Sequence, residues 1–102
     1  NLLSKRRYEV YRNRNEIISQ ILDTANCDDG ITKSKLMFRA YLSHDQLQEY
    51  TLLLIDNGML HYDSTMRTFK TTEKGLRFLH VYNEISSMAK EEQPLQEMWI
   101  YR

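Results

Sequence analysis

Hydrophobic and polar positions follow a helical period between residues 43 and 58. On a helical wheel at about 100° per residue, one side carries Leu47, Tyr50, Thr51 and Leu54. The opposite side carries Asp45, Gln48, Glu49, Leu52 and Asp56. Ser43 followed by Gln46 is a capping box, and Gly58 supplies the left-handed residue that closes a helix. We therefore predict a helix with locally specified ends, one buried face and one exposed face.

The pattern changes to that of a β-hairpin after this helix. Residues 59–63 (MLHYD) are apolar and aromatic, and residues 64–67 (STMR) have the chemistry of a turn. Residues 68–71 (TFKT) are again β-branched and aromatic. Two short strands joined by a turn are therefore predicted.

Two further helices are predicted before the hairpin. Within residues 15–25 an apolar stripe recurs at helical spacing: Ile17, Ile18, Ile21, Leu22 and Ala25. Thr32 is a candidate N-cap for a second helix over residues 33–41. The inward positions of that helix are Leu36, Met37 and Ala40. Ile31 stands where a short strand can pair with the hairpin, and residues 41–42 form the turn into the next helix.

The resulting order is helix, helix, helix, strand, turn, strand and helix, which is the order of a winged helix-turn-helix domain. The second and third helices form the helix-turn-helix pair, and the hairpin forms the wing. The predicted fold class is α+β, mostly α, with a long C-terminal dimerisation helix. We divide the chain into a basic N-terminal arm, a winged core, the C-terminal helix and an apolar tail: 1–13, 14–72, 73–93 and 94–102.

The fourth helix is predicted from residue 73 to about residue 90, and Pro94 is expected to end it. Leu76 and Leu79 point to one side. Four other apolar residues follow the 3-4-3 spacing of a short coiled-coil seam: Phe78, Val81, Ile85 and Met88. Either two such helices bury the seam in a homodimer, or the helix belongs to a monomer and overhangs its core. The tail around Trp99 is too apolar to float free and is expected to dock on the domain or on a partner subunit.

Composition permits one small domain and narrows the choice of partner. The chain has 102 residues, of which 41% are hydrophobic, and its formal net charge is zero. A nucleic acid would therefore have to meet a local cluster of cations. No apolar run is long enough to cross a bilayer and no signal-peptide pattern opens the chain, so a soluble, cytoplasmic protein is expected. The single cysteine, Cys27, cannot form an internal disulfide and is expected to be a buried or idle thiol.

The N-terminal arm is the most basic segment and contains Lys5, Arg6, Arg7 and Arg12. Tyr8 and Val10 alternate with charged residues, which suits a strand, but a helical extension of the next element fits as well. We expect the arm either to lie along DNA phosphates or to form a solvated terminus.

Three segments carry a family resemblance: KSKLMFRAYLS at 33–43, LLLIDNGML at 52–60 and TTEKGLRFL at 71–79. They resemble the archaeal family of small winged helix-turn-helix proteins, predicted transcriptional regulators that include the ten-kilodalton DNA-binding protein of Sulfolobus. The resemblance spans roughly residues 14–88, and the TEKG block after the wing is its most specific piece. It implies a DNA-binding fold, an antiparallel coiled-coil homodimer through the last helix, a role in transcription or chromatin organisation, and no cofactor.

The resemblance and the charges together nominate residues for contact with double-stranded DNA. The cations stand on the second helix, the wing and the start of the fourth helix: Lys33, Lys35, Arg39, Arg67, Lys70 and Lys74. The start of the recognition helix adds side chains able to reach bases or phosphates: His44, Gln46 and Gln48. Against this assignment, Asp45, Glu49 and Asp56 on the outward face of that helix would repel phosphates.

The residue pattern gives no support to catalysis or to a metal site. His44, His61 and His80 lie at no metal-ligand spacing with one another or with Cys27. With three glycines the chain has no glycine-rich phosphate loop. Ser, His and Asp at 43–45 are sequence neighbours, and neighbouring helical residues point apart, so they make no triad. We therefore expect no enzyme, metal or cofactor.

Two functions of different classes remain open. The first is a DNA-binding, nucleoid-associated dimer that regulates transcription or organises chromatin. The second is a protein-interaction module without intrinsic DNA binding, which uses the acidic face around Leu52 and the tail around Trp99 to hold a partner in the transcription machinery. Family precedent favours the first, whereas the neutral net charge and the acidic third helix favour the second.

Overall fold

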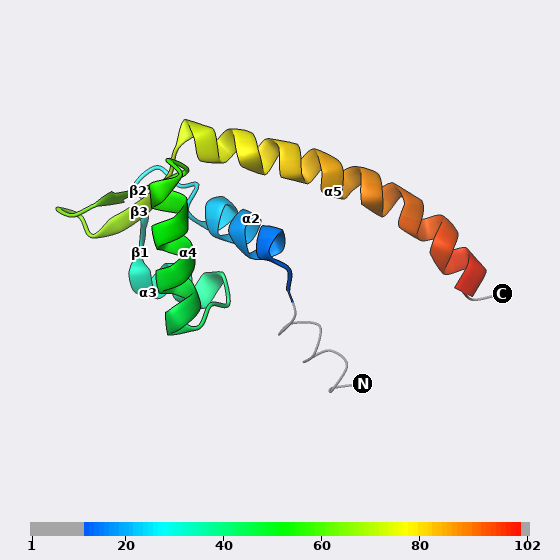
Figure 1. Ribbon diagram of the computed structural model, residues 1–102, viewed down its shortest axis with the longest axis horizontal. Helices are drawn as coiled ribbons and strands as arrows, with labels where there is room; N and C mark the ends of the chain where they lie inside the picture. Colours follow the sequence, from blue (N-terminus) through cyan, green and yellow to red (C-terminus); the bar gives the residue numbers. More distant parts are fainter. Residues whose placement is uncertain (1–11, 101–102) are drawn as a thin grey trace.

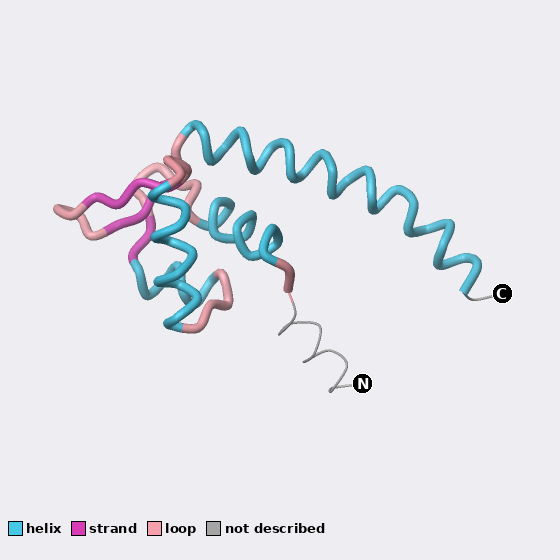
Figure 2. The backbone as a smooth tube through the Cα atoms, viewed as in Figure 1, coloured by secondary structure: helices cyan, strands magenta, loops and turns pink. Residues whose placement is uncertain are grey.

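The computed structural model describes residues 12–100, with side chains described to residue 89. The elements are α2 (Arg14–Thr24), β1 (Ile31–Thr32), α3 (Lys33–Arg39), α4 (His44–Asp56), β2 (Leu60–Asp63), β3 (Thr68–Thr71) and α5 (Glu73–Ile100). Helices α2, α3 and α4 gather beside a small sheet, and α5 leaves this body as a long arm (Figures 1 and 2). The predicted winged helix-turn-helix fold is confirmed. Most of the predicted N-terminal arm lies outside the described residues.

The core forms where the apolar stripes of the short helices meet. Asn13 caps α2 by accepting a hydrogen bond from the Glu16 backbone N–H at 2.8 Å. The largest fully buried side chains come from α2, α3 and α4: Ile21, Leu22, Leu36, Leu47 and Leu54. These are positions that helical spacing assigned to the inside, because one face of each helix must leave water. Within the described side chains, every buried nitrogen and oxygen has a hydrogen-bond partner.

Helix α4 has the two ends that its sequence specifies. The Gln46 backbone N–H donates to the Ser43 hydroxyl at 3.1 Å, and the Ser43 backbone N–H donates to the Gln46 side-chain oxygen at 3.0 Å. At the other end Gly58 has φ +72, which lets the Met59 N–H reach the Leu54 carbonyl at 2.9 Å. The capping box and the C-terminal closure are both confirmed.

Helix α3 closes in the same way, but without glycine. Tyr41 adopts φ 55, and the Leu42 N–H donates to the Met37 carbonyl at 2.9 Å. A left-handed conformation strains a residue with a Cβ atom by about 1–2 kcal/mol. The turn between α3 and α4 therefore stores strain at Tyr41.

The sheet is antiparallel, with strand order β1-β3-β2. Phe69 on β3 faces Ile31 on one side and Tyr62 on the other. The wing turn is shaped by Asp63, whose side chain accepts hydrogen bonds from the Thr65 and Met66 N–H groups at 2.9 and 3.1 Å. The short strand expected at Ile31 is confirmed; it consists of two residues and attaches the wing to the start of α3.

A tight joint connects the end of α4 to the start of α5. The Thr72 hydroxyl donates to the Gly58 carbonyl at 2.6 Å, and the Lys74 ammonium donates to the Asn57 carbonyl at 2.7 Å. Gly75 passes so close to the Met59 carbonyl that an added Cβ would lie 2.3 Å from its oxygen. The glycine is therefore required for close backbone contact, and the two helices are fixed to each other at this point.

Helix α5 differs from its prediction in two respects. Leu79 is buried in the core, but Leu76, expected on the same side, is 38% exposed. The helix also runs to Ile100, beyond the end expected at Pro94. A proline removes one N–H donor and crowds the carbonyl four residues earlier, which bends a helix where it does not end it; α5 curves along its length (Figure 1).

Candidate nucleic-acid interface

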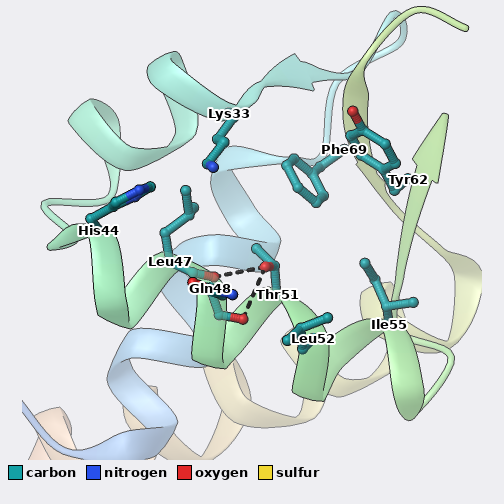
Figure 3. A pocket seen from close by; sticks show the side chains of 9 residues that line it. All are labelled: Lys33, His44, Leu47, Gln48, Thr51, Leu52, Ile55, Tyr62 and Phe69. Carbon is teal, nitrogen blue, oxygen red and sulfur yellow. Dashed lines mark hydrogen bonds between the residues drawn. The ribbon is translucent and has the colours of Figure 1, made fainter. Parts of the chain in front are cut away.

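A groove separates the exposed side of α4 from the wing. It encloses about 390 Å³ and is lined by nine residues from α3, α4, β2 and β3: Lys33, His44, Leu47, Gln48, Thr51, Leu52, Ile55, Tyr62 and Phe69. Figure 3 shows Lys33 and His44 toward one end, with Ile55 and Tyr62 toward the other. The groove therefore has a polar end and an apolar end.

The helical period of α4 separates its polar groups into two stripes. His44, Gln48 and Ile55 fall within one stripe and line the groove. Glu49 and Asp56 line a neighbouring hollow on the outer side of the helix, which also contains Arg14 and shares Leu52 and Ile55 with the groove. None of the nine groove residues is acidic. The carboxylates that argued against a DNA contact thus lie outside the groove.

The polar end of the groove offers uncommitted hydrogen-bonding groups. Lys33, His44 and Gln48 are all exposed. Among the described residues, no side-chain hydrogen bond or ion pair engages any of the three. The Lys33 ammonium points into the groove (Figure 3). These groups are free to bind an anion or a base edge.

The apolar end is built by the wing. The Tyr62 and Phe69 rings pack with centroids 4.8 Å apart and planes inclined at 49°. Leu52 and Ile55 on α4 face them across the groove (Figure 3), and Leu52 is 60% exposed. Tyr62, Phe69 and Ile55 were not predicted to belong to the site, although the alternation along β2 and β3 could have placed Tyr62 and Phe69 on one face.

The remaining predicted DNA contacts are distributed around the groove. Lys35 and Arg39 are exposed on α3 but do not line it. Gln46 uses its side-chain oxygen in the capping box. Arg67 occupies the turn of the wing with φ 56 and is exposed. Lys33 is thus the predicted cation that the structure brings into the groove.

Two other predicted cations make structural contacts. Lys70 donates to the Asp28 carbonyl at 2.9 Å, and Lys74 donates to the Asn57 carbonyl at 2.7 Å. The second contact places a positive charge at the C-terminal end of α4, where the helix dipole is negative. Both lysines were predicted to contact DNA, and both donate hydrogen bonds within the chain.

Arg12 has a structural role that the sequence did not reveal. Its guanidinium donates to the Ala40 carbonyl at 3.1 Å and to the Tyr41 carbonyl at 2.9 Å, and it also contacts the Gln20 side chain. It thereby ties the strained turn between α3 and α4 to α2. This residue of the basic arm supports the helix-turn-helix pair.

The predicted dimer seam is only partly free. Phe78 packs against the core and stacks on Tyr82, with ring centroids 6.4 Å apart. Beyond it, Val81, Ile85 and Met88 are 52%, 61% and 66% exposed. An apolar ridge, defined by these three residues, therefore runs along α5 outside the core.

The described residues also bear on other kinds of site. Among the described side chains, residues 12–89, no group of three His, Cys, Asp or Glu is arranged to hold a metal ion. The Cys27 thiol is exposed, so the expected alternative of a buried thiol is wrong. No helix in the described part of the chain combines the length and hydropathy needed to cross a membrane.

Comparisons with known proteins agree with this architecture. A match to the winged helix-turn-helix family covers residues 11–90. The fold is similar to the crystal structure of Sso10a-2, a DNA-binding protein from Sulfolobus solfataricus, with a TM-score of 0.69 and 20% sequence identity over 85% of this chain and 92% of that chain. A comparison with curated proteins gave no match. Because the family match extends over the helix-turn-helix pair, the wing and the start of α5, the chain belongs to the winged helix-turn-helix family.

Proposed function

We propose that this protein binds double-stranded DNA through the groove side of α4 and the wing, as a binding protein without catalytic activity. The observation that carries the proposal is the separation of charge on α4. Lys33, His44 and Gln48 border a groove without carboxylates, while Glu49 and Asp56 lie on another stripe. The similarity to a DNA-binding protein supports the same function.

The positions of these residues suggest that some contact phosphates and others contact bases. Lys33 can meet a phosphate from the groove and Arg67 from the turn between β2 and β3, because both are exposed cations. Gln48 can pair with an adenine edge, and His44 can donate to a guanine or a phosphate. Lys35 and Arg39 can add phosphate contacts from α3. Positioning is thus assigned to the cations, and sequence reading to two residues of α4.

We further propose that the protein acts as a homodimer. The ridge of Val81, Ile85 and Met88 repeats at coiled-coil spacing and is exposed in a single chain. Packing two α5 helices along this ridge would bury it and would join two winged domains, each with few cations. A dimer therefore compensates for the zero net charge by doubling the number of phosphate contacts. Such a dimer fits a role in transcription regulation or in a nucleoid.

The test is fluorescence anisotropy with mixed-sequence duplex DNA over a salt series, using the intact chain and the variants Lys33→Gln and Arg67→Gln. We expect each variant to weaken binding and to reduce the slope of log K against log salt by about one. The matched control is Arg77→Gln, an equal change of charge on an exposed α5 residue outside the groove. Loss of binding in the control equal to that in the two variants would contradict the assignment.

A second candidate is a protein-interaction module in the transcription machinery. It is favoured by the acidic stripe of α4, where Glu49 and Asp56 flank Leu52, an apolar residue that is 60% exposed. An alternation of apolar and acidic groups on one surface suits a basic, amphipathic partner. Failure to bind any duplex even at low salt would contradict the first proposal and favour this one.

A further inference from the structure

The groove between α4 and the wing has the construction of a small-molecule site. Its volume of about 390 Å³ lies in the range of about 300–1,000 Å³ that is typical of ligand pockets. Such pockets combine apolar walls with a few polar groups at one place. The groove meets both conditions, since five of its nine lining residues are aliphatic or aromatic: Leu47, Leu52, Ile55, Tyr62 and Phe69.

The walls favour a flat, apolar occupant. The inclined rings of Tyr62 and Phe69 form one wall, and the Leu52 and Ile55 side chains stand opposite (Figure 3). An aromatic ring placed between them would bury apolar surface on both of its faces. The Thr51 hydroxyl on the floor already donates to the Leu47 carbonyl at 2.7 Å, so it does not demand a polar partner from the occupant. A planar aromatic group fits these walls.

The polar end specifies the charge of the occupant. Lys33 carries a positive charge, and Gln48 and His44 add N–H donors beside it. The lining contains no carboxylate that could neutralise the lysine within the groove. Because a cation and N–H donors line this part of the groove, an anionic group with several acceptor oxygens is the complementary partner.

We propose that this groove binds a small planar aromatic carboxylate, with the ring between the wing and α4 and the carboxylate at Lys33. The proposal has a consequence that rests on the proposed DNA-binding function. Lys33, His44 and Gln48 would contact either the ligand or DNA, so the two would exclude each other. Because the coupling is reciprocal, bound DNA would lower the affinity for the ligand by the same factor by which bound ligand lowers the affinity for DNA. The groove would then make DNA binding responsive to a metabolite of this class.

The first experiment uses no DNA. The intact protein is titrated with 2-naphthoate while amide chemical shifts are followed by NMR, and the neutral 2-naphthamide is titrated in parallel. We expect saturable shifts at α4, β2 and β3, and a naphthoate affinity at least tenfold higher than that of the amide. Equal affinities for the two compounds, or shifts that map instead to the ridge on α5, would overturn the proposal.

Three variants locate the interaction. Lys33→Gln is expected to lower naphthoate affinity at least tenfold and to change naphthamide affinity less than twofold. Leu52→Asp is expected to lower the affinity for both compounds. Arg77→Gln, an equal change of charge at an exposed α5 residue outside the groove, is expected to leave both unchanged. A loss with Arg77→Gln equal to that with Lys33→Gln would show that only general charge matters, and would overturn the site.

Competition is measured separately, by adding 2-naphthoate to the protein with fluorescent duplex DNA. Release of DNA at the naphthoate concentration that saturates the NMR shifts supports mutual exclusion. Naphthoate binding without any DNA affinity supports the pocket and overturns its regulatory consequence. DNA binding without naphthoate binding overturns the pocket and leaves the DNA function standing. Groove shifts that depend on protein concentration alone would assign the groove to a second copy of the chain and overturn the proposal.

Discussion

Apolar side chains are buried in the winged core but exposed on the outer part of α5. In the core, Ile21, Leu22 and Leu36 are completely removed from water. On α5 beyond Leu79, the apolar ridge of Val81, Ile85 and Met88 is more than half exposed. The core is thus complete within the described residues, whereas none of them covers the ridge.

Apolar residues at the same helical spacing are therefore buried in some helices of this chain and exposed in another. In α2 and α4 the apolar stripe meets other elements of the chain, and caps fix where each helix starts. In α5 the stripe continues after the body of the protein has ended, so no described residue of the core covers it. Stability of the winged core and assembly through α5 should therefore respond to different substitutions.

The largest effect on folding is expected from Leu54→Ala in the core. Leu54 is 1% exposed, and removing a buried leucine side chain costs about 3 kcal/mol through lost burial and the cavity left behind. Urea unfolding measures the change. The matched control is Leu52→Ala on the same helix, where 60% exposure predicts a change below about 0.5 kcal/mol. Equal costs at the two positions would contradict the described core.

Assembly should respond most to Ile85→Asp. A carboxylate on the ridge would have to be buried between two helices, so we expect the dimer dissociation constant to rise at least about 100-fold, or about 2.7 kcal/mol. Sedimentation velocity over a concentration series reports the change. Asn83→Asp, which adds the same charge to an exposed residue off the ridge, is the control. An unchanged association state in Ile85→Asp would refute the dimer proposed here.

A smaller loss is expected from Ser43→Ala. The substitution removes the hydroxyl that accepts the Gln46 N–H at the start of α4, and loss of such a cap costs about 1 kcal/mol. The chain offers Ser34→Ala as a comparison, since Ser34 is an exposed residue inside α3. Urea unfolding should show destabilisation only at position 43, and a similar loss at both positions would mean that the cap is not the cause.

The smallest effect is a gain from Tyr41→Gly. Tyr41 has φ 55 and its side chain is 77% exposed, so glycine would relieve strain while little contact is lost. Relief of about 1–2 kcal/mol is partly offset by the entropy of glycine in the unfolded chain, leaving a gain of about 0.5 kcal/mol. Tyr41→Ala keeps the strain and should show no gain in thermal melts. A gain in the alanine variant as large as that in the glycine variant would exclude backbone strain as its source.

The elements were predictable because their signals are local. Ser43, Gln46 and Gly58 specify the ends of α4 within a short stretch, and the predicted strands of the wing were confirmed. The end of α5 was not predictable in this way, because a proline only weakens a helix and the outcome depends on the rest of it. Local chemistry therefore gave the order of the elements better than their lengths.

The candidate site was predictable only in part. Lys33, His44 and Gln48 were selected from the sequence and lie together in the groove. The contacts of Lys70 and Lys74 with backbone carbonyls join residues 42 and 17 positions apart, so they depend on the tertiary fold. The position of Glu49 and Asp56 outside the groove likewise depends on where the wing packs against α4, which is a property of the tertiary fold.

The joint between α4 and α5 couples the orientations of the two helices. Thr72, Lys74 and Gly75 fasten the first turn of α5 to the loop that follows α4, so the two helices must turn together. In the proposed dimer, a change in the angle at which the two α5 helices cross would be transmitted to the orientation of α4 in each subunit. The spacing and tilt of the two grooves would then depend on contacts along α5, far from the grooves themselves.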